Sequence, residues 1–206
     1  MALYIPDINL LFVHIPKTAG ISIRHALMAG NKFGFGISGI EIGSVHNGIL
    51  DVAQERGVDF ANKTNTSFGV VRNPYDWAVS YYEFSKTFFV HPDHPIIKDM
   101  NFNTFVSFVC QSVEEKRITS IGRYMTQTDY LFDSNGKKIV NVILRFEQLK
   151  DDWNIICLIA KADVSLRHLN ESTIRKDYES YYDDRTISMI NKTFYNDFIN
   201  FNYKFL

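Results

Sequence analysis

FVHIPKTAGIS, residues 12–22, decides which fold the sequence predicts. Its first part belongs to an apolar run over 9–15 that a proline follows at once, as expected at the end of a buried strand. Its last part begins GISIRHALMAG (20–30), whose apolar spacing predicts a helix that ends at Gly30. The stretch therefore predicts a strand, a short loop and a helix.

The loop between these two elements has the chemistry of an anion site. The first N–H groups of a helix have no internal acceptor, and the helix dipole adds partial positive charge there. Lys17 supplies a full charge, and Gly20 lets a ligand approach the backbone closely. The hydroxyls of Thr18 and Ser22 can donate to phosphate oxygens. A plain strand-to-helix turn would use similar residues, so the loop alone leaves both interpretations open.

Two common nucleotide motifs do not fit the sequence. A Walker A loop has its glycines before the lysine, whereas Lys17 precedes Gly20 here. GFGISG (34–39) matches the dinucleotide fingerprint letter by letter, but it follows a predicted helix instead of a strand and no clear helix begins from it. We therefore reject GFGISG as a dinucleotide site.

A second strand-to-helix junction lies in SFGVVRNPYDWAVSYY (67–82). The apolar run predicts a buried strand, Asn73 is a good N-cap and Pro74 a good first helical residue. Arg72 stands at the end of the strand, and Ser80 lies about two turns into the helix. An arginine and a hydroxyl near the carboxyl end of a strand can hold a second phosphate, although each alone would also suit an ordinary surface.

The rest of the chain continues the alternation of strands and helices. We expect helices over 74–89, 103–115, 146–162 and 184–201, an exposed loop over 91–101, and a hairpin over 128–146 that turns at Asn135–Gly136 and ends in a core strand. Such alternation is typical of an α/β fold with a central, mainly parallel sheet flanked by helices. We see no repeat or linker and expect a single domain over 1–206.

Composition narrows the classes of function. The formal net charge of -1 argues against binding to nucleic acid through bulk charge. No apolar run approaches the roughly 18 residues of a membrane span, and residues 1–17 lack the pattern of a signal peptide. We therefore expect a cytoplasmic protein that has no membrane span and binds no nucleic acid.

Together, the two junctions resemble the PAPS-dependent sulfotransferases, most closely the heparan- and chondroitin-type carbohydrate branch with its bacterial and viral relatives. FVHIPKTAGIS resembles that family's 5′-phosphosulfate loop, and VVRNPYDWAVSYY (70–82) its 3′-phosphate motif. Three weaker segments follow in the family's order: RFEQLKDDW (145–153), HLNES (168–172) and FYNDFINFNYKF (194–205). The resemblance implies a P-loop-NTPase-like sulfotransferase fold, with PAPS as cosubstrate and no metal.

The resemblance also assigns roles to residues. Lys17 would stabilise the leaving phosphate, and Arg72 and Ser80 would bind the 3′-phosphate, with Ser172 closing over it. The residues that would surround the 5′-phosphate are Thr18, Ala19, Gly20, Ile21 and Ser22, with Ala19 and Ile21 acting through their backbone. Relatives carry a glycine at the position of Ala19, a hydroxyl residue at Ile21 and Asp at Asn73; none of these changes predicts an inactive enzyme.

An acceptor hydroxyl needs a base, and His46 is the first candidate because an imidazole titrates near neutral pH. Glu41 is the alternative, and a purely structural His46 is a third interpretation. His14 is expected to orient the strand end. By family analogy the acceptor is a carbohydrate or another small hydroxyl compound.

Some residues keep more than one interpretation. His91, Asp93 and His94 are metal-ligand types, but an exposed loop that helps to bind the acceptor suits their sequence better. Arg123 and Gln127 are weak candidates for contact with either substrate. Two other functions also stay open: a nucleotide kinase, with Glu147 as a faint Walker B carboxylate, and a module that binds PAPS or its product PAP without transfer.

Overall fold

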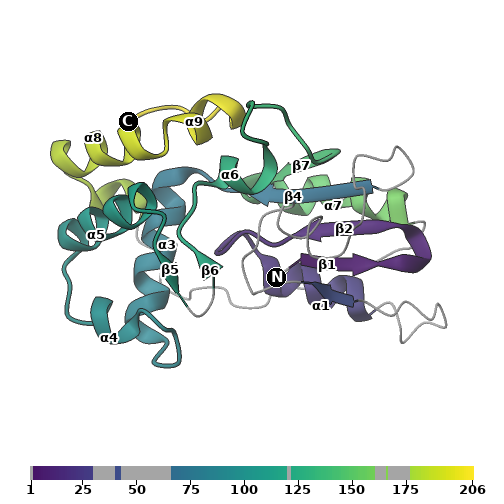
Figure 1. The fold of residues 1–206 in the computed structure, drawn as a ribbon, viewed down its shortest axis with the longest axis horizontal. Coiled ribbons are helices and arrows are strands. Elements are labelled where there is room, and N and C mark those ends of the chain that lie inside the picture. Colours follow the sequence, from purple (N-terminus) through teal and green to yellow (C-terminus); the bar gives the residue numbers. More distant parts are fainter. Residues whose placement is uncertain (1, 30–39, 43–65, 120–121, 161–165, 167–176) are drawn as a thin grey trace. The chain divides into compact units, whose positions relative to one another are not determined.

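The computed structural model describes residues 2–29, 40–42, 66–119, 122–160, 166 and 177–206. Residue contacts divide the chain into two compact units, which are described in turn (Figure 1). Unit 1 comprises Met1–Val71 and Asp129–Glu171, and unit 2 comprises Arg72–Thr128 and Ser172–Leu206. The single domain over 1–206 stays a prediction.

A mixed sheet forms the centre of unit 1. Its described strands are β1 (Ala2–Ile5), β2 (Leu10–Val13), β3 (Ile40–Ile42), β4 (Thr66–Val71) and β7 (Val142–Arg145), in the order β3-β1-β2-β4-β7. β2 pairs with β4 and β4 with β7 in parallel, whereas β1 is antiparallel to both β2 and β3. Among these strands only β1 therefore runs against the others. The α/β fold with a mainly parallel sheet is confirmed.

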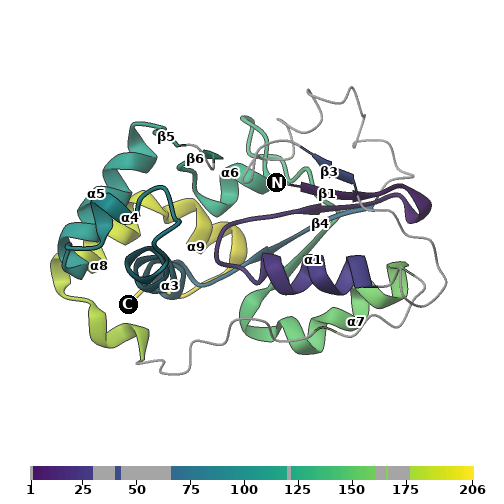
Figure 2. The ribbon, with the colours of Figure 1, turned by 90° about the horizontal axis from the view of Figure 1, so that it is seen from below.

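Two helices cover one face of this sheet, α1 (Gly20–Ala29) and α7 (Leu149–Ala160), as Figure 2 shows. Alternate strand residues point toward them because side chains alternate between the faces of a sheet. The apolar core on this side contains Leu10, Phe12, Phe68, Val70 and Leu144 from the strands and Ile23, Ala26, Leu27, Trp153 and Ile156 from the helices. Two short 3-10 helices, η1 (Pro6–Ile8) and η3 (Phe146–Gln148), precede β2 and α7.

Unit 2 is mainly helical, and its core is rich in aromatic rings. Its described elements are α3 (Pro74–Thr87), α4 (His94–Ile97), α5 (Phe102–Glu114), η4 (Tyr178–Tyr181), α8 (Asp184–Thr193), α9 (Tyr195–Phe201) and the small hairpin β5 (Ile118–Thr119) with β6 (Gly122–Arg123). α5 lies beside α8 (Figure 1). Trp77 and Tyr81 stack nearly parallel in this core.

Two expected elements, the hairpin over 128–146 and the helix over 184–201, differ from the structure. The first arm of the hairpin over 128–146 is largely α6 (Gln127–Leu131), and the hairpin itself is reduced to one bridge between Phe132 and Lys138 around the predicted turn. Gly136 adopts φ 74° there, a conformation that glycine tolerates well. The helix expected over 184–201 is interrupted at Phe194, which separates α8 from α9.

The predicted exposed loop over 91–101 is only partly correct, since Pro95, Ile96, Lys98, Asp99 and Asn101 are exposed. It contains α4, and His91 and Asp93 are only 6% and 2% exposed. In the part of the chain that the structure describes, no helix is long and apolar enough to span a membrane.

Candidate functional site

The loop between β2 and α1 has an unusual backbone. Lys17 and Ala19 have φ angles of 64° and 66°, in the left-handed region, whereas Thr18 between them does not. Left-handed conformations cost a residue with a Cβ about 1–2 kcal/mol. Alternation of this kind turns successive peptide N–H groups toward one side and forms a concavity that suits an anion. This geometry goes beyond what an ordinary strand-to-helix turn requires.

Helix α1 adds to this concavity. Its first backbone hydrogen bond runs from the Ile23 N–H to the Ala19 carbonyl, 3.0 Å. The N–H groups of Gly20 and Ile21 come before that bond and lie at the positive end of the helix dipole. Ile21 is 49% exposed, so the chain presents an apolar group to solvent at this position.

The Thr18 hydroxyl is already engaged within the loop. It donates to the Ile15 carbonyl over 2.9 Å, and the residue is fully buried. In this structure the hydroxyl therefore donates to the backbone, and its contact with a phosphate stays a prediction. Ser22, in the first turn of α1, is also buried.

Gly20 is required by a neighbouring ring. A Cβ at Gly20 would lie 1.8 Å from Nε2 of His14, far inside van der Waals contact. The buried His14 ring also stacks on Phe12, with ring centroids 5.8 Å apart. His14 therefore holds the end of β2 against the start of α1 by packing.

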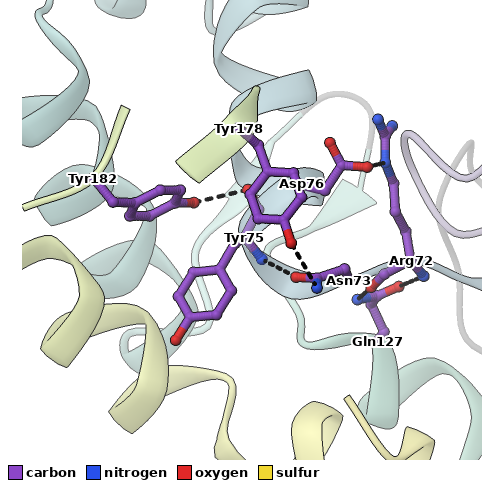
Figure 3. Close-up of polar contacts among 7 residues, drawn as sticks. All are labelled: Arg72, Asn73, Tyr75, Asp76, Gln127, Tyr178 and Tyr182. Carbon is purple, nitrogen blue, oxygen red and sulfur yellow. Dashed lines mark hydrogen bonds and ion pairs between the residues drawn. The ribbon is translucent and has the colours of Figure 1, made fainter. Parts of the chain in front are cut away.

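Arg72 follows β4 directly and is the first residue of unit 2. It is 5% exposed, and its Nε donates to Oδ2 of Asp76 over 2.7 Å (Figure 3). Asp76 lies one helical turn further on, the spacing at which side chains of a helix meet. Asp76 is not among the residues predicted for the site, although its spacing from Arg72 is visible in the sequence.

The start of α3 is capped as the sequence predicted. The Asn73 side chain accepts from the Tyr75 N–H over 3.0 Å, and Pro74 is the first helical residue. Ser80 is half-buried and lies four residues after Asp76, so both lie along one side of α3. Within unit 2, the structure therefore aligns Arg72, Asp76 and Ser80.

The strands that lead to the two segments are neighbours. β2 and β4 are parallel, with Val13 opposite Gly69, so both end at the same edge of the sheet. In doubly wound α/β folds, ligands bind beyond the carboxyl ends of such strands. The loop around Lys17 follows β2 at this edge of unit 1, and β4 is followed in the chain by Arg72, the first residue of unit 2.

Several predicted residues lie outside the described part of the chain. They are His46, Ser172 and GFGISG (34–39). The backbone of Glu41 pairs with Leu3, and that of Arg123 with Ile118.

His91 and Asp93 belong to a buried network. The hydroxyls of Tyr81 and Tyr124 both donate to Oδ2 of Asp93, and the Asp93 N–H donates to Nδ1 of His91 over 3.2 Å. Burial, and then the Asp93 carboxylate, raise the pKa of Tyr124 above its ordinary value. Among the described residues, no group of three metal-ligand side chains could hold a metal ion.

Comparison with known proteins identifies the family. A model of the sulfotransferase family matches residues 1–204, nearly the whole chain. The chain therefore belongs to the sulfotransferase family. The family and the class of enzyme expected from the sequence, a PAPS-dependent sulfotransferase, are confirmed.

A solved structure also has a similar fold. It is a mouse sulfotransferase, SULT7A1, complexed with PAP; the TM-score is 0.56, the identity 11%, and the match covers 94% of this chain and 84% of that one. At this identity the likeness concerns the fold alone. No curated protein matches the chain.

Proposed function

We propose that this sulfotransferase moves the sulfuryl group of PAPS to a hydroxyl of a carbohydrate, using Lys17 and the loop around it to hold the 5′-phosphosulfate. One observation carries the proposal: left-handed Lys17 and Ala19 lead into the N-terminus of α1. A loop of that shape offers several N–H groups and one full positive charge to a single anion.

Lys17 acts where negative charge develops. In the reaction, the acceptor oxygen forms a bond to sulfur while the bond from sulfur to the bridging oxygen breaks. The electron pair of the broken bond stays on the 5′-phosphate of the departing PAP. A cation beside that bridging oxygen stabilises the transition state more than the ground state. The backbone of Thr18, Ala19, Gly20 and Ile21, together with Ser22, orients the group for in-line attack.

The second segment recognises the 3′-phosphate. The Arg72 guanidinium carries a permanent charge, and Asp76 fixes its orientation by holding Nε. Ser80, on the same side of α3, donates its hydroxyl, and Ser172 completes this half of the site. A 3′-phosphate contact separates PAPS from ATP, which has none. The mouse sulfotransferase of similar fold is complexed with PAP, which is consistent with such a site.

The acceptor proton needs a base, and His46 is the proposed one, with Glu41 as the alternative. His46→Ala should lower the turnover number strongly and leave binding of PAP unchanged. Glu41→Ala, tested in parallel, should retain activity. If Glu41→Ala lost activity and His46→Ala kept it, Glu41 would be assigned as the base in place of His46.

The test of the proposal is formation of PAP from PAPS across a panel of acceptors. The panel contains uronic acid and amino sugar oligosaccharides, phenols and simple alcohols. We expect PAP formation that depends on an oligosaccharide, without added metal. Tight binding of PAP with no transfer to any acceptor would indicate a binding module. Phosphoryl transfer from magnesium-ATP, with PAPS inert, would indicate a kinase and overturn the proposal.

A further inference from the structure

The side chain of Gln127 binds the backbone of Arg72 through both ends of its amide. Its Oε1 accepts from the Arg72 N–H over 2.8 Å, and its Nε2 donates to the Arg72 carbonyl over 2.7 Å (Figure 3). Gln127 is 2% exposed, so water does not compete for these bonds. The sequence suggested a contact between Gln127 and a substrate; the structure shows this contact with Arg72 instead.

The two hydrogen bonds between the Gln127 side chain and the Arg72 backbone form a clamp, and its position explains what it contributes. β4 ends at Val71, which pairs with Arg145 of β7. The next residue, Arg72, lies beyond the ladder, and a buried N–H or carbonyl that lacks a partner is costly. A glutamine side chain carries the same donor and acceptor as a peptide group. Gln127 thus supplies the backbone of Arg72 with the hydrogen bonds that a neighbouring strand would otherwise provide.

Gln127 is itself held by a buried carboxylate. Asp197, in α9, is fully buried and accepts from the N–H groups of Gln127 and Thr128 over 2.9 Å and 2.7 Å. The Thr128 hydroxyl donates to the same carboxylate over 2.7 Å. Three donors stabilise the buried charge and fix the start of α6. The contacts therefore run from Asp197 through Gln127 to the backbone of Arg72.

The guanidinium end of Arg72 is fixed separately, by Asp76. Backbone and side chain of one arginine are thus both held by buried partners in unit 2. Such restraint lowers the entropy that the arginine loses when it binds an anion, and it fixes the direction of its donors.

We propose that Gln127, anchored by Asp197, is a positioning residue that sets the preference for a 3′-phosphate by fixing the backbone of Arg72. The inference rests on the proposed function, since it assigns the 3′-phosphate to Arg72. A merely structural Gln127 would weaken all nucleotide binding to the same degree. A positioning residue weakens only the part of binding that Arg72 provides.

The experiment compares PAP with AMP, which lacks only the 3′-phosphate, by calorimetric titration of the full chain. Gln127→Met keeps the length of the side chain and removes both hydrogen bonds. We expect the preference for PAP over AMP to fall about tenfold, as for the loss of buried hydrogen bonds, with the affinity for AMP unchanged. The matched control is Gln111→Met, an exposed glutamine of α5, which should keep the preference of the wild type.

Other results would decide against the proposal or the proposed function. If Gln127→Met weakens the binding of PAP and of AMP equally, the proposal about Gln127 is overturned. The proposed function would still hold in that case, because the wild type prefers PAP. If Gln127→Met does not fold, Gln127→Asn keeps the amide but shortens its reach, and the preference should then fall by a smaller factor. If neither variant folds, the clamp serves folding and the proposal is overturned. A wild type that does not prefer PAP would overturn the proposed function itself.

Discussion

The segment around Lys17 and the segment around Arg72 are both strand-to-helix junctions, yet different contacts shape them. The first is shaped by its own backbone: two left-handed residues and a glycine against which the His14 ring packs. The second has no left-handed residue before its proline and is held by side chains, Gln127 on the main chain and Asp76 on the guanidinium.

Under the proposed function, this difference follows from what each segment has to present. A phosphosulfate that several N–H groups must surround requires a backbone bent to one side, which costs conformational energy. A 3′-phosphate whose charge is matched by a single arginine requires that this side chain be fixed, which buried hydrogen bonds supply. Substitutions in the first segment should therefore act through sterics and φ angles, and those in the second through polar partners.

The largest effect is expected from Lys17→Ala. Removal of the charge beside the bridging oxygen should lower the turnover number about 10²–10³-fold, as for other groups that stabilise developing charge. The measurement is PAP formation with the acceptor that the screen identifies. Lys137→Ala, an exposed lysine at the predicted turn, is the control and should be neutral. A loss of less than about threefold in Lys17→Ala would contradict the assigned role.

Gly20→Ala tests whether packing shapes the first segment. The added Cβ would meet the His14 ring, and we expect a loss of about 1–3 kcal/mol in the free energy of unfolding, measured by urea denaturation. In a His14→Ala background the same change should cost much less, because the ring is gone. Equal costs in both backgrounds would show that the His14 contact is unimportant.

Tyr124→Phe tests the dependence of unit 2 on polar partners. The pKa of Tyr124 is raised by burial and by Asp93, so its stabilising contribution is present below the unfolded pKa near 10 and is lost as the pH rises further. Between pH 8 and pH 11 the wild type should lose about 1 kcal/mol more stability than Tyr124→Phe does. Tyr195→Phe, at an exposed tyrosine, is the control and should show the same pH dependence of stability as the wild type. If Tyr124→Phe also shows the wild-type pH dependence, the Asp93 network does not contribute to stability.

The smallest effect is expected from Ala19→Gly. Relief of the left-handed alanine, about 1–2 kcal/mol, should exceed the entropic cost of glycine, about 0.4–1 kcal/mol, and leave a gain of about 0.5–1 kcal/mol. The shift in the midpoint of urea denaturation between Ala19→Gly and the wild type measures this gain. Ala26→Gly, inside α1, should instead destabilise by about 1 kcal/mol or more. Destabilisation by Ala19→Gly would contradict the strained loop.

Local patterns predicted the parts of the fold that local forces determine. β2, α1, β4 and α3 agree with expectation, because apolar spacing, the Asn73 cap and Pro74 act within a few residues. His91 and Asp93 were misplaced at the surface, because their burial depends on Tyr124, which lies 31 positions from Asp93 in the chain. No window of sequence around 91–94 contains that partner.

The site was predictable to a similar degree. The motifs singled out Lys17 and Arg72, but they contain no sign that Thr18 would turn its hydroxyl inward to Ile15. The clamp on Arg72 depends on Asp197, a residue of the last helix, and only the fold brings it to Gln127. Long-range polar contacts are therefore what the sequence patterns leave out.

Calorimetric titration with PAP tests the central claim, that the Lys17 and Arg72 segments bind one nucleotide by its two phosphate ends. The proteins are the wild type, Lys17→Ala and Arg72→Ala, with ADP and magnesium-ATP as competing ligands. The account predicts tight binding of PAP by the wild type, clearly weaker binding in both variants, and a preference over ADP that Arg72→Ala loses. Equal or tighter binding of magnesium-ATP, or unchanged binding of PAP in either variant, would contradict it.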